Sequence, residues 1–233
     1  MQGLILAAGK GTRMGNIEVP KCLLEINGVP IIKHQINSFK KNGINDIVVV
    51  TGYKSEMIHD LLNDQVQYVH NSKFNEMNNI YSVWLAIQKL RGDFICVYGD
   101  LMFDEEILKK CLEIKSEIGL MVETNTRDET MKVKIENEKI VAVNKKIGYK
   151  TADGNFVGMA KFSKNVLKIL FNEIDYLITE NIDGYYTLGI ENLIKKNIEV
   201  GYQVTNGLSW MDIDEEREFE ESQKIFRDGG DLS

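Results

Sequence analysis

The stretch from Leu4 to Lys21 restricts the fold of this chain more than any other. An apolar run at residues 3–8 is long enough for one buried strand. The loop that follows combines glycines with polar residues: Gly9, Lys10, Gly11, Thr12, Arg13 and Gly15. Glycine lets backbone N–H groups approach an anion closely, and cationic side chains add charge-assisted hydrogen bonds. Lys21 follows a proline, so its approach is extended and stiff. A strand that delivers such a loop is suited to binding a polyphosphate.

Glycine-rich turns after a first strand occur in many α/β proteins, so the loop alone does not identify its ligand. Two familiar nucleotide fingerprints do not fit it. The dinucleotide pattern G-x-G-x-x-G requires glycine where Met14 stands, and the pattern G-x-x-x-x-G-K-[ST] is absent. The loop therefore belongs to another class.

Predicted strands and helices alternate along the chain. Apolar runs predict strands at residues 22–26, 46–51, 66–70, 94–100 and 118–123, a hairpin at 133–136 and 139–143, and a strand at 157–162. Helical spacing predicts helices at 31–42, 55–62, 80–90, 104–111, 165–174 and 190–196. Such alternation predicts a mostly parallel sheet covered on both faces. We therefore expect an α/β fold over residues 1–233: a single-domain, Rossmann-like three-layer sandwich with a mixed, mostly parallel sheet.

Composition limits the partners of this chain. The net charge is −7, so we expect no nucleic acid partner, and any phosphate site must be a local concentration of cations. The three cysteines and three histidines match neither zinc nor redox spacings. Lys10 and Arg13 interrupt the apolar start and no run reaches membrane length, so we expect no signal peptide, no membrane partner and a cytoplasmic location.

Two acidic motifs are suited to holding a cation. Asp100 follows a glycine at the carboxyl end of a predicted strand, and Asp212 and Asp214 form an Asp-x-Asp motif near the C-terminus. Because side chains alternate in an extended segment, both carboxylates of that motif face one side. Mg²⁺ prefers one or two carboxylates together with substrate phosphates. The alternatives are that Asp100 is a turn residue and that one of the pair caps a helix beginning near Glu216.

The order of these motifs resembles the signature of a known enzyme family. The chain contains L-A-A-G-x-G-T-R-M, then Pro20-Lys21, N-N-x-Y-S at residues 78–82, Gly99-Asp100 and W-M-D-I-D at residues 210–214. This series resembles the nucleotidyltransferases with a GT-A-like fold. The resemblance implies an enzyme that joins a nucleoside triphosphate to a phosphorylated small molecule and releases pyrophosphate, with Mg²⁺ as cofactor.

The resemblance also implies roles for individual residues. Arg13 is expected at the β- and γ-phosphates and Lys21 at the α-phosphate, as the two catalytic cations. Asp100 with Asp212 or Asp214 is expected to hold the metal. Residues expected to contact the nucleotide are Leu6, Ala7, Ala8, Gly9, Gly11, Thr12, Asn71, Asn79 and Ser82. For the Asn78-Asn79 pair, capping of the following helix is the alternative.

The second half of the chain resembles the acceptor-binding part of the family. We expect a nucleotide-binding half at about residues 1–117 and an acceptor-binding half at about residues 118–233. Lys132 stands where relatives carry a lysine that faces the acceptor phosphate, although a solvated strand lysine is an equal alternative. Tyr185 is suited to line an acceptor pocket or to fill an edge of the core.

Within the family, the resemblance is to cytidylyltransferases for phosphocholine, 2-aminoethylphosphonate or inositol phosphate. We therefore expect a CTP-dependent enzyme that joins CMP to a phosphorylated or phosphonate small molecule. The alternatives are a uridylyl- or guanylyltransferase that makes a nucleotide sugar, and a catalytically silent nucleotide-binding regulator. The sequence identifies neither the acceptor nor the oligomeric state, for which a homodimer is one option.

Overall fold

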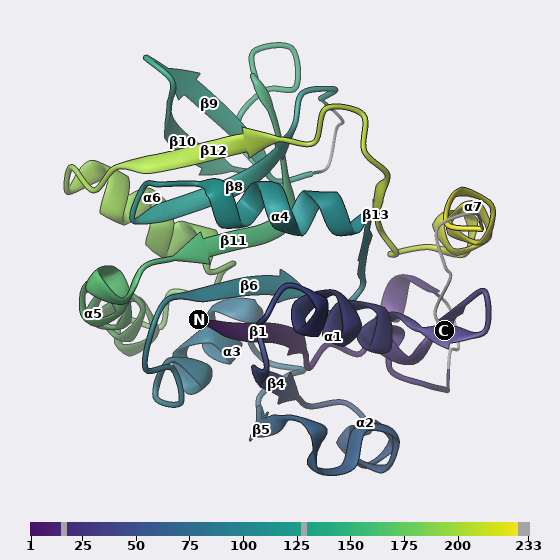
Figure 1. The fold of residues 1–233 in the computed structure, drawn as a ribbon. Coiled ribbons are helices and arrows are strands. Elements are labelled where there is room, and N and C mark those ends of the chain that lie inside the picture. The colour runs from purple at the N-terminus through teal and green to yellow at the C-terminus, as the bar shows by residue number, and fades with distance from the viewer. Residues whose placement is uncertain (15–17, 127–129, 228–233) are drawn as a thin grey trace.

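A nine-stranded sheet forms the middle layer of the computed structural model, which describes residues 1–14, 18–126 and 130–227 (Figure 1). Its strands are β1 (Gln2–Ala7), β4 (Asp46–Thr51), β5 (Gln67–His70), β6 (Phe94–Tyr98), β8 (Ile118–Glu123), β9 (Lys132–Glu136), β10 (Lys139–Asn144), β11 (Gly154–Phe162) and β12 (Val200–Val204).

The strand order is β10-β9-β11-β6-β1-β4-β5, and β8 pairs with β11 on one side and β12 on the other. Strands β1, β4, β5 and β6 are mutually parallel, as are β8 and β12. Strand β11 is antiparallel to β6, β8 and β9, and β10 is antiparallel to β9. Among the described strands of this sheet, only β10 and β11 therefore oppose the common direction. This confirms the expected mixed, mostly parallel sheet.

Helices cover both faces of the sheet because the strand residues alternate between two cores. Ile5 joins the core under α1 (Ile31–Lys41), α2 (Ser55–Leu62) and α4 (Glu105–Glu113). Its neighbours Leu4 and Leu6 join the core under α3 (Asn79–Ile87), α5 (Leu167–Thr179) and α6 (Thr187–Lys195). Such two-sided burial explains why the strands read as continuous apolar runs. The result is the three-layer arrangement expected from the sequence.

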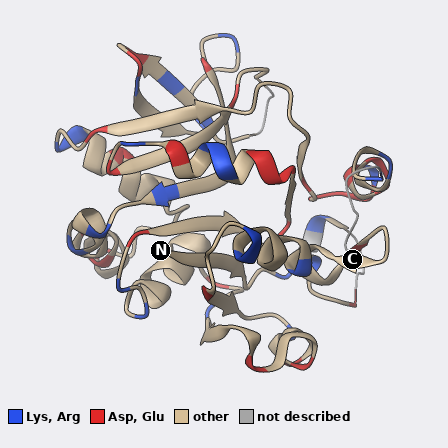
Figure 2. Ribbon diagram, viewed as in Figure 1, with Lys and Arg blue, Asp and Glu red and all other residues tan. Residues whose placement is uncertain are grey.

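Charged residues lie mainly on the outer helices and loops, as Figure 2 shows. The central strands β1 and β6 contain no charged residue. The three cysteines are buried and free, which agrees with a packing role. None of the described helices combines the length and the apolar surface that a bilayer crossing needs.

Two small two-stranded sheets flank the main one and approach its carboxyl edge. A hairpin joins β2 (Glu25–Ile26) to β3 (Val29–Pro30), and β7 (Leu101–Phe103) pairs with β13 (Trp210–Asp212). The last helix, α7 (Glu216–Ile225), follows β13, and Phe219 packs in a small core with Ile26 and Met211. Strands β7 and β12 were not predicted, because neither has a long apolar run.

The strand predicted at residues 22–26 is wrong for its first part. Four short 3₁₀ turns occur among the described residues: η1 (Thr12–Met14), η2 (Lys21–Leu23), η3 (Asn63–Gln65) and η4 (Lys164–Val166). In η2 the N–H of Leu23 donates to the carbonyl of Pro20, and that of Leu24 donates to Lys21. These local hydrogen bonds hold Lys21 in a tight turn instead of an extended strand.

Candidate active site

The glycine loop positions Lys21 at the carboxyl end of β1. Gly11 has a φ of +66°, and a Cβ at this position would lie 2.6 Å from Cγ of Lys21. Both the left-handed backbone and the close approach require glycine. The Lys21 side chain therefore packs directly under the loop, and the residue is only 8% exposed. Thr12 begins η1, but its side chain and Gly15 lie outside the described residues.

Asp100, Asp212 and Asp214 come together although they are far apart in the sequence. Asp100 lies in the turn between β6 and β7, and β13 pairs antiparallel with β7. The N–H of Ile213 donates to the carbonyl of Asp100 at 3.1 Å, which joins the two motifs directly. One oxygen from each carboxylate lies within 4.8 Å of the others. The structure thus brings together the three residues that the sequence predicted as metal ligands.

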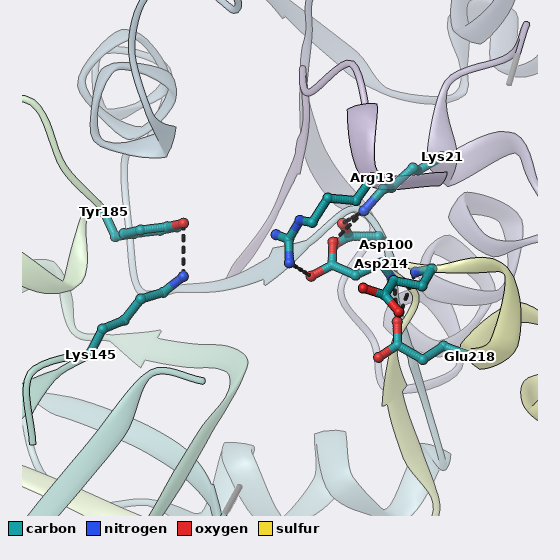
Figure 3. A network of polar contacts seen from close by, with 8 residues as sticks. Arg13, Lys21, Asp100, Lys145, Tyr185, Asp214 and Glu218 are labelled. Atoms are coloured by element: carbon teal, nitrogen blue, oxygen red, sulfur yellow. Dashed lines mark hydrogen bonds and ion pairs between the residues drawn. The ribbon is translucent and has the colours of Figure 1, made fainter. Parts of the chain in front are cut away.

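Lys21 and Arg13 form ion pairs with this carboxylate cluster (Figure 3). Nζ of Lys21 lies 3.4 Å from Oδ2 of Asp100 and also contacts Oδ1 of Asp214. Nη1 of Arg13 lies 2.9 Å from Oδ2 of Asp214. The side chain of Lys21 is 9% exposed, whereas that of Arg13 is 61% exposed. Lys21 is therefore a fixed part of the site, and Arg13 can change partners with little loss of packing.

Burial and the close approach of the carboxylates together determine the electrostatics of the site. Burial opposes the charge of Lys21, but the carboxylates of Asp100 and Asp214 outweigh burial and raise its pKa. Burial, followed by the charges of Asp100 and Asp214, raises the pKa of Asp212 well above its ordinary value. Three carboxyl groups thus lie beside the two cations Arg13 and Lys21, and the raised pKa of Asp212 means that its ionised form is disfavoured there.

This donor set fits a divalent cation. Oδ1 of Asp212 is buried and has no hydrogen-bond partner within the described residues. Such an orphaned acceptor costs free energy unless another group binds it. Clustered carboxylate oxygens are the ligands that hard cations such as Mg²⁺ prefer. The residues present therefore fit the Mg²⁺ that the sequence resemblance implies.

Glu218 fixes the main chain next to Asp214 (Figure 3). Its Oε2 accepts the backbone N–H of Asp214 at 2.7 Å and that of Glu215 at 2.9 Å. The side chain of Glu215 accepts the N–H of Glu218 in return, which completes a capping box at the start of α7. Glu215, and not an aspartate of the motif, is thus the residue that caps this helix.

The polar residues predicted to meet the nucleoside already have protein partners. Asn71 is fully buried; its Nδ2 donates to Oγ of Ser82 at 3.0 Å, and its Oδ1 accepts a backbone N–H two residues on. Oδ1 of Asn79 accepts the N–H of Tyr186 at 2.9 Å. Asn78 occupies the N-cap position of α3, but its side chain makes no capping hydrogen bond. Helix capping therefore does not account for this pair.

These groups line one cleft with a volume of about 640 Å³. The sequence-predicted residues that line it are Leu6, Ala7, Ala8, Gly9, Gly11, Arg13, Lys21, Asn71, Asn79, Ser82, Asp100, Tyr185, Asp212 and Asp214. Its other wall includes residues 156–158, where β11 bends at Gly158, which has a φ of +87°. The bend lets the first part of β11 pair with β9 and its last part with β6. The cleft therefore lies between the two halves of the chain.

Lys145 adds a cation to the cleft that sequence reasoning missed. Its Nζ lies 3.1 Å from Oη of Tyr185 and 4.6 Å from the centre of that ring. Figure 3 shows this pair across from Arg13, Lys21 and the carboxylates. The only signal in the sequence was the pair Lys145-Lys146, which follows the strand predicted at 139–143 after one asparagine.

The structure does not place Lys132 in this cleft. Lys132 pairs with Asn155 in the interior of the sheet, is 2% exposed, and donates through Nζ to the carbonyl of Thr130 at 3.3 Å. The head group of Lys132 therefore binds a backbone carbonyl, and Lys132 is not among the residues that line the cleft. Among the described residues, the lysines that line the cleft are Lys21 and Lys145.

The sequence is similar to those of curated cytidylyltransferases along most of its length. Over 92% of this chain and 96% of the relative, the sequence is 28% identical to CTP:phosphoglutamine cytidylyltransferase of Campylobacter jejuni. It is also 28% identical to choline-phosphate cytidylyltransferase of Streptococcus pneumoniae, over 97% of this chain and 99% of the relative.

The fold matches solved nucleotidyltransferases along nearly its whole length. The inositol-1-phosphate CTP transferase from T. maritima superposes with a TM-score of 0.81 and 22% identity, over 98% of this chain and 97% of that one. The family model described as MobA-like NTP transferase domain matches residues 3–131, which is more than half of the chain. The chain therefore belongs to the MobA-like NTP transferase family.

Proposed function

We propose that this protein is a CTP-dependent cytidylyltransferase that joins CMP to a phosphorylated or phosphonate small molecule and releases pyrophosphate. The observation that carries the proposal is the cleft, in which Arg13, Lys21 and the three carboxylates face Lys145. Full-length similarity to enzymes named for CTP and for phosphoglutamine or choline phosphate supports the choice of nucleotide and acceptor class.

The two sides of the cleft bind the two substrates in this proposal. Residues 1–117 hold the nucleotide through the glycine loop and the polar residues of α3. Residues 118–233 hold the acceptor, with Lys145 and Tyr185 at its phosphate or phosphonate group. A lysine beside a tyrosine hydroxyl offers a cation and a donor to the same anion.

The reaction is an in-line displacement at the α-phosphorus of CTP. An anionic acceptor oxygen forms the new P–O bond, and the bond to the oxygen that bridges the α- and β-phosphates breaks, so pyrophosphate leaves. No side-chain nucleophile is needed, because the acceptor oxygen is already negative. Catalysis therefore rests on positioning and on stabilisation of the charge that develops.

Lys21 and Arg13 supply that stabilisation, one from a buried and one from an exposed side chain. Buried Lys21 is placed at the α-phosphate, where charge develops in the transition state. Exposed Arg13 exchanges its ion pair with Asp214 for the β- and γ-phosphates when the nucleotide binds. Asp100 with Asp212 or Asp214 would hold Mg²⁺, which supplies further neutralisation of the phosphate charge when bound.

A screen for pyrophosphate release tests this proposal. Purified protein with Mg²⁺ is given each of the four nucleoside triphosphates, crossed with a panel of phosphorylated amines, alcohols and phosphonates. We expect release with CTP and at least one acceptor, and at least 10²-fold less with Lys21→Ala. Release with UTP or GTP and a hexose phosphate instead would favour a nucleotide-sugar enzyme. No release with any pair would favour a regulator that only binds nucleotide.

A further inference from the structure

Gln35 is a buried side chain behind the turn that carries Asp100. It lies on α1 and is fully buried. Its Nε2 donates to the carbonyl of Tyr98 at 2.8 Å and to the carbonyl of Leu101 at 2.7 Å. These two residues flank Gly99-Asp100 on either side. Both amide hydrogens of one side chain are thus committed to the backbone that brackets Asp100.

The other contacts of this turn involve Gly99 and Asp100, not the carbonyls that Gln35 binds. The N–H of Gly99 donates to the carbonyl of Leu6 at 3.0 Å, which ties the turn to β1. A Cβ on Gly99 would lie 2.9 Å from Cα of Ala7, so the turn is pressed against that strand. The carbonyl of Asp100 itself accepts the N–H of Ile213, the residue after β13. From the side of α1, Gln35 donates to the carbonyls of Tyr98 and Leu101.

We propose that Gln35 is a positioning residue, which holds the turn so that the Asp100 carboxylate stays within the cluster of Asp212 and Asp214. The inference rests on the metal role proposed above for Asp100. Only a group with two N–H donors at one nitrogen can serve two carbonyl oxygens in this geometry. Without it, two buried acceptors lose their partner, and the turn relaxes towards other donors. Partners that orient metal ligands typically change metal affinity by about 10–100-fold when removed.

The test measures metal affinity directly, as Mn²⁺ binding at saturating CTP followed by water-proton relaxation. We expect Gln35→Met, which keeps the side-chain volume, to weaken Mn²⁺ binding by about 10-fold or more. The matched control is Ser38→Ala on the same helix, because Ser38 is also a buried polar residue and its hydroxyl has no partner within the described residues. This control should bind Mn²⁺ within twofold of the parent. Urea unfolding of both variants shows what each costs in stability.

A double-mutant comparison separates positioning from general destabilisation. In an Asp100→Asn background, Gln35→Met should weaken Mn²⁺ binding no further, because the ligand that it positions is gone. Gln35→Asn, a milder change that cannot span both carbonyls, should lie between the parent and Gln35→Met. Folded Gln35→Met with parent-like Mn²⁺ affinity, an additive effect in the double mutant, or failure of both Gln35 variants to fold would each overturn the proposal. Unchanged Mn²⁺ binding in Asp100→Asn alone would instead refute the metal role of Asp100.

Discussion

Lys21→Met removes the buried cation of the carboxylate cluster while keeping most of the side-chain volume. Nζ of Lys21 is 3.4 Å from Asp100, and two unit charges at that distance interact by about 5 kcal/mol at an effective dielectric constant of 20. Asp100 and Asp214 keep 24% and 21% of their side-chain exposure, so solvent screens part of this attraction. We expect a net loss of about 2–3 kcal/mol in the metal-free protein.

In a chain of this size, each kcal/mol corresponds to about 2–4 °C, so the melting temperature should fall by about 4–12 °C. Thermal unfolding with and without Mg²⁺ measures the change. Added Mg²⁺ should raise the melting temperature of Lys21→Met more than that of the parent, because it replaces the lost positive charge. In the assay for pyrophosphate release, kcat should fall by about 10²–10³.

Lys109→Met is the matched control for this prediction. Lys109 also lies beside two carboxylates, at 3.9 Å from Glu105 and 3.2 Å from Glu106, but it is 49% exposed. Exposed ion pairs are typically worth less than about 1 kcal/mol, so both the melting temperature and kcat should stay close to those of the parent. If Lys21→Met behaved like Lys109→Met, the assignment of Lys21 to the α-phosphate would be wrong.

Three further changes test other parts of the cleft. Gly11→Ala places an alanine in the left-handed region and against the Lys21 side chain. It should therefore lower stability by about 1–2 kcal/mol in thermal unfolding and lower kcat. Parent-like kinetics would show that the loop accommodates the added methyl group. Lys145→Met should raise KM for the acceptor about 10-fold or more without raising KM for CTP, because a lost charged hydrogen bond costs about 1.5–3 kcal/mol. Exposed Lys146→Met is its control, and equal rises in both KM values would argue against an acceptor site. Glu218→Gln keeps a hydrogen-bond acceptor, so its Mg²⁺ concentration for half-maximal activity should equal that of the parent. Glu218→Ala should need about 10-fold more Mg²⁺ for half-maximal activity. Identical Mg²⁺ titrations for the two variants would exclude the positioning role.

Local patterns in the sequence were sufficient for the parts of the site that lie at the ends of apolar strands. The loop after β1 and the turn after β6 follow uninterrupted buried runs, and parallel strands bring their carboxyl ends to one edge. The loop with Arg13 and Lys21 and the turn with Asp100 could therefore be expected at one edge of the sheet, whereas their individual roles came from the family resemblance. The alternation of side chains likewise predicted that Asp212 and Asp214 act together.

The remaining parts depend on contacts between distant segments, which no local pattern encodes. The pairing of β7 with β13 joins Asp100 to the C-terminal motif, yet each strand has only three residues. Lys145 lines the cleft from the loop after β10, whereas the head group of Lys132 binds the carbonyl of Thr130. Gln35 looks like an ordinary polar residue of an amphipathic helix until the turn behind it is seen.

Mass spectrometry of the reaction products tests the central claim most directly. Protein, Mg²⁺, CTP and an acceptor that supports pyrophosphate release are incubated together, in parallel with the Asp100→Asn variant. The account predicts a product with the mass of the acceptor plus CMP less water, formed mole for mole with pyrophosphate and lost in Asp100→Asn. Free CMP without such a product, or an undiminished rate in Asp100→Asn, would contradict it.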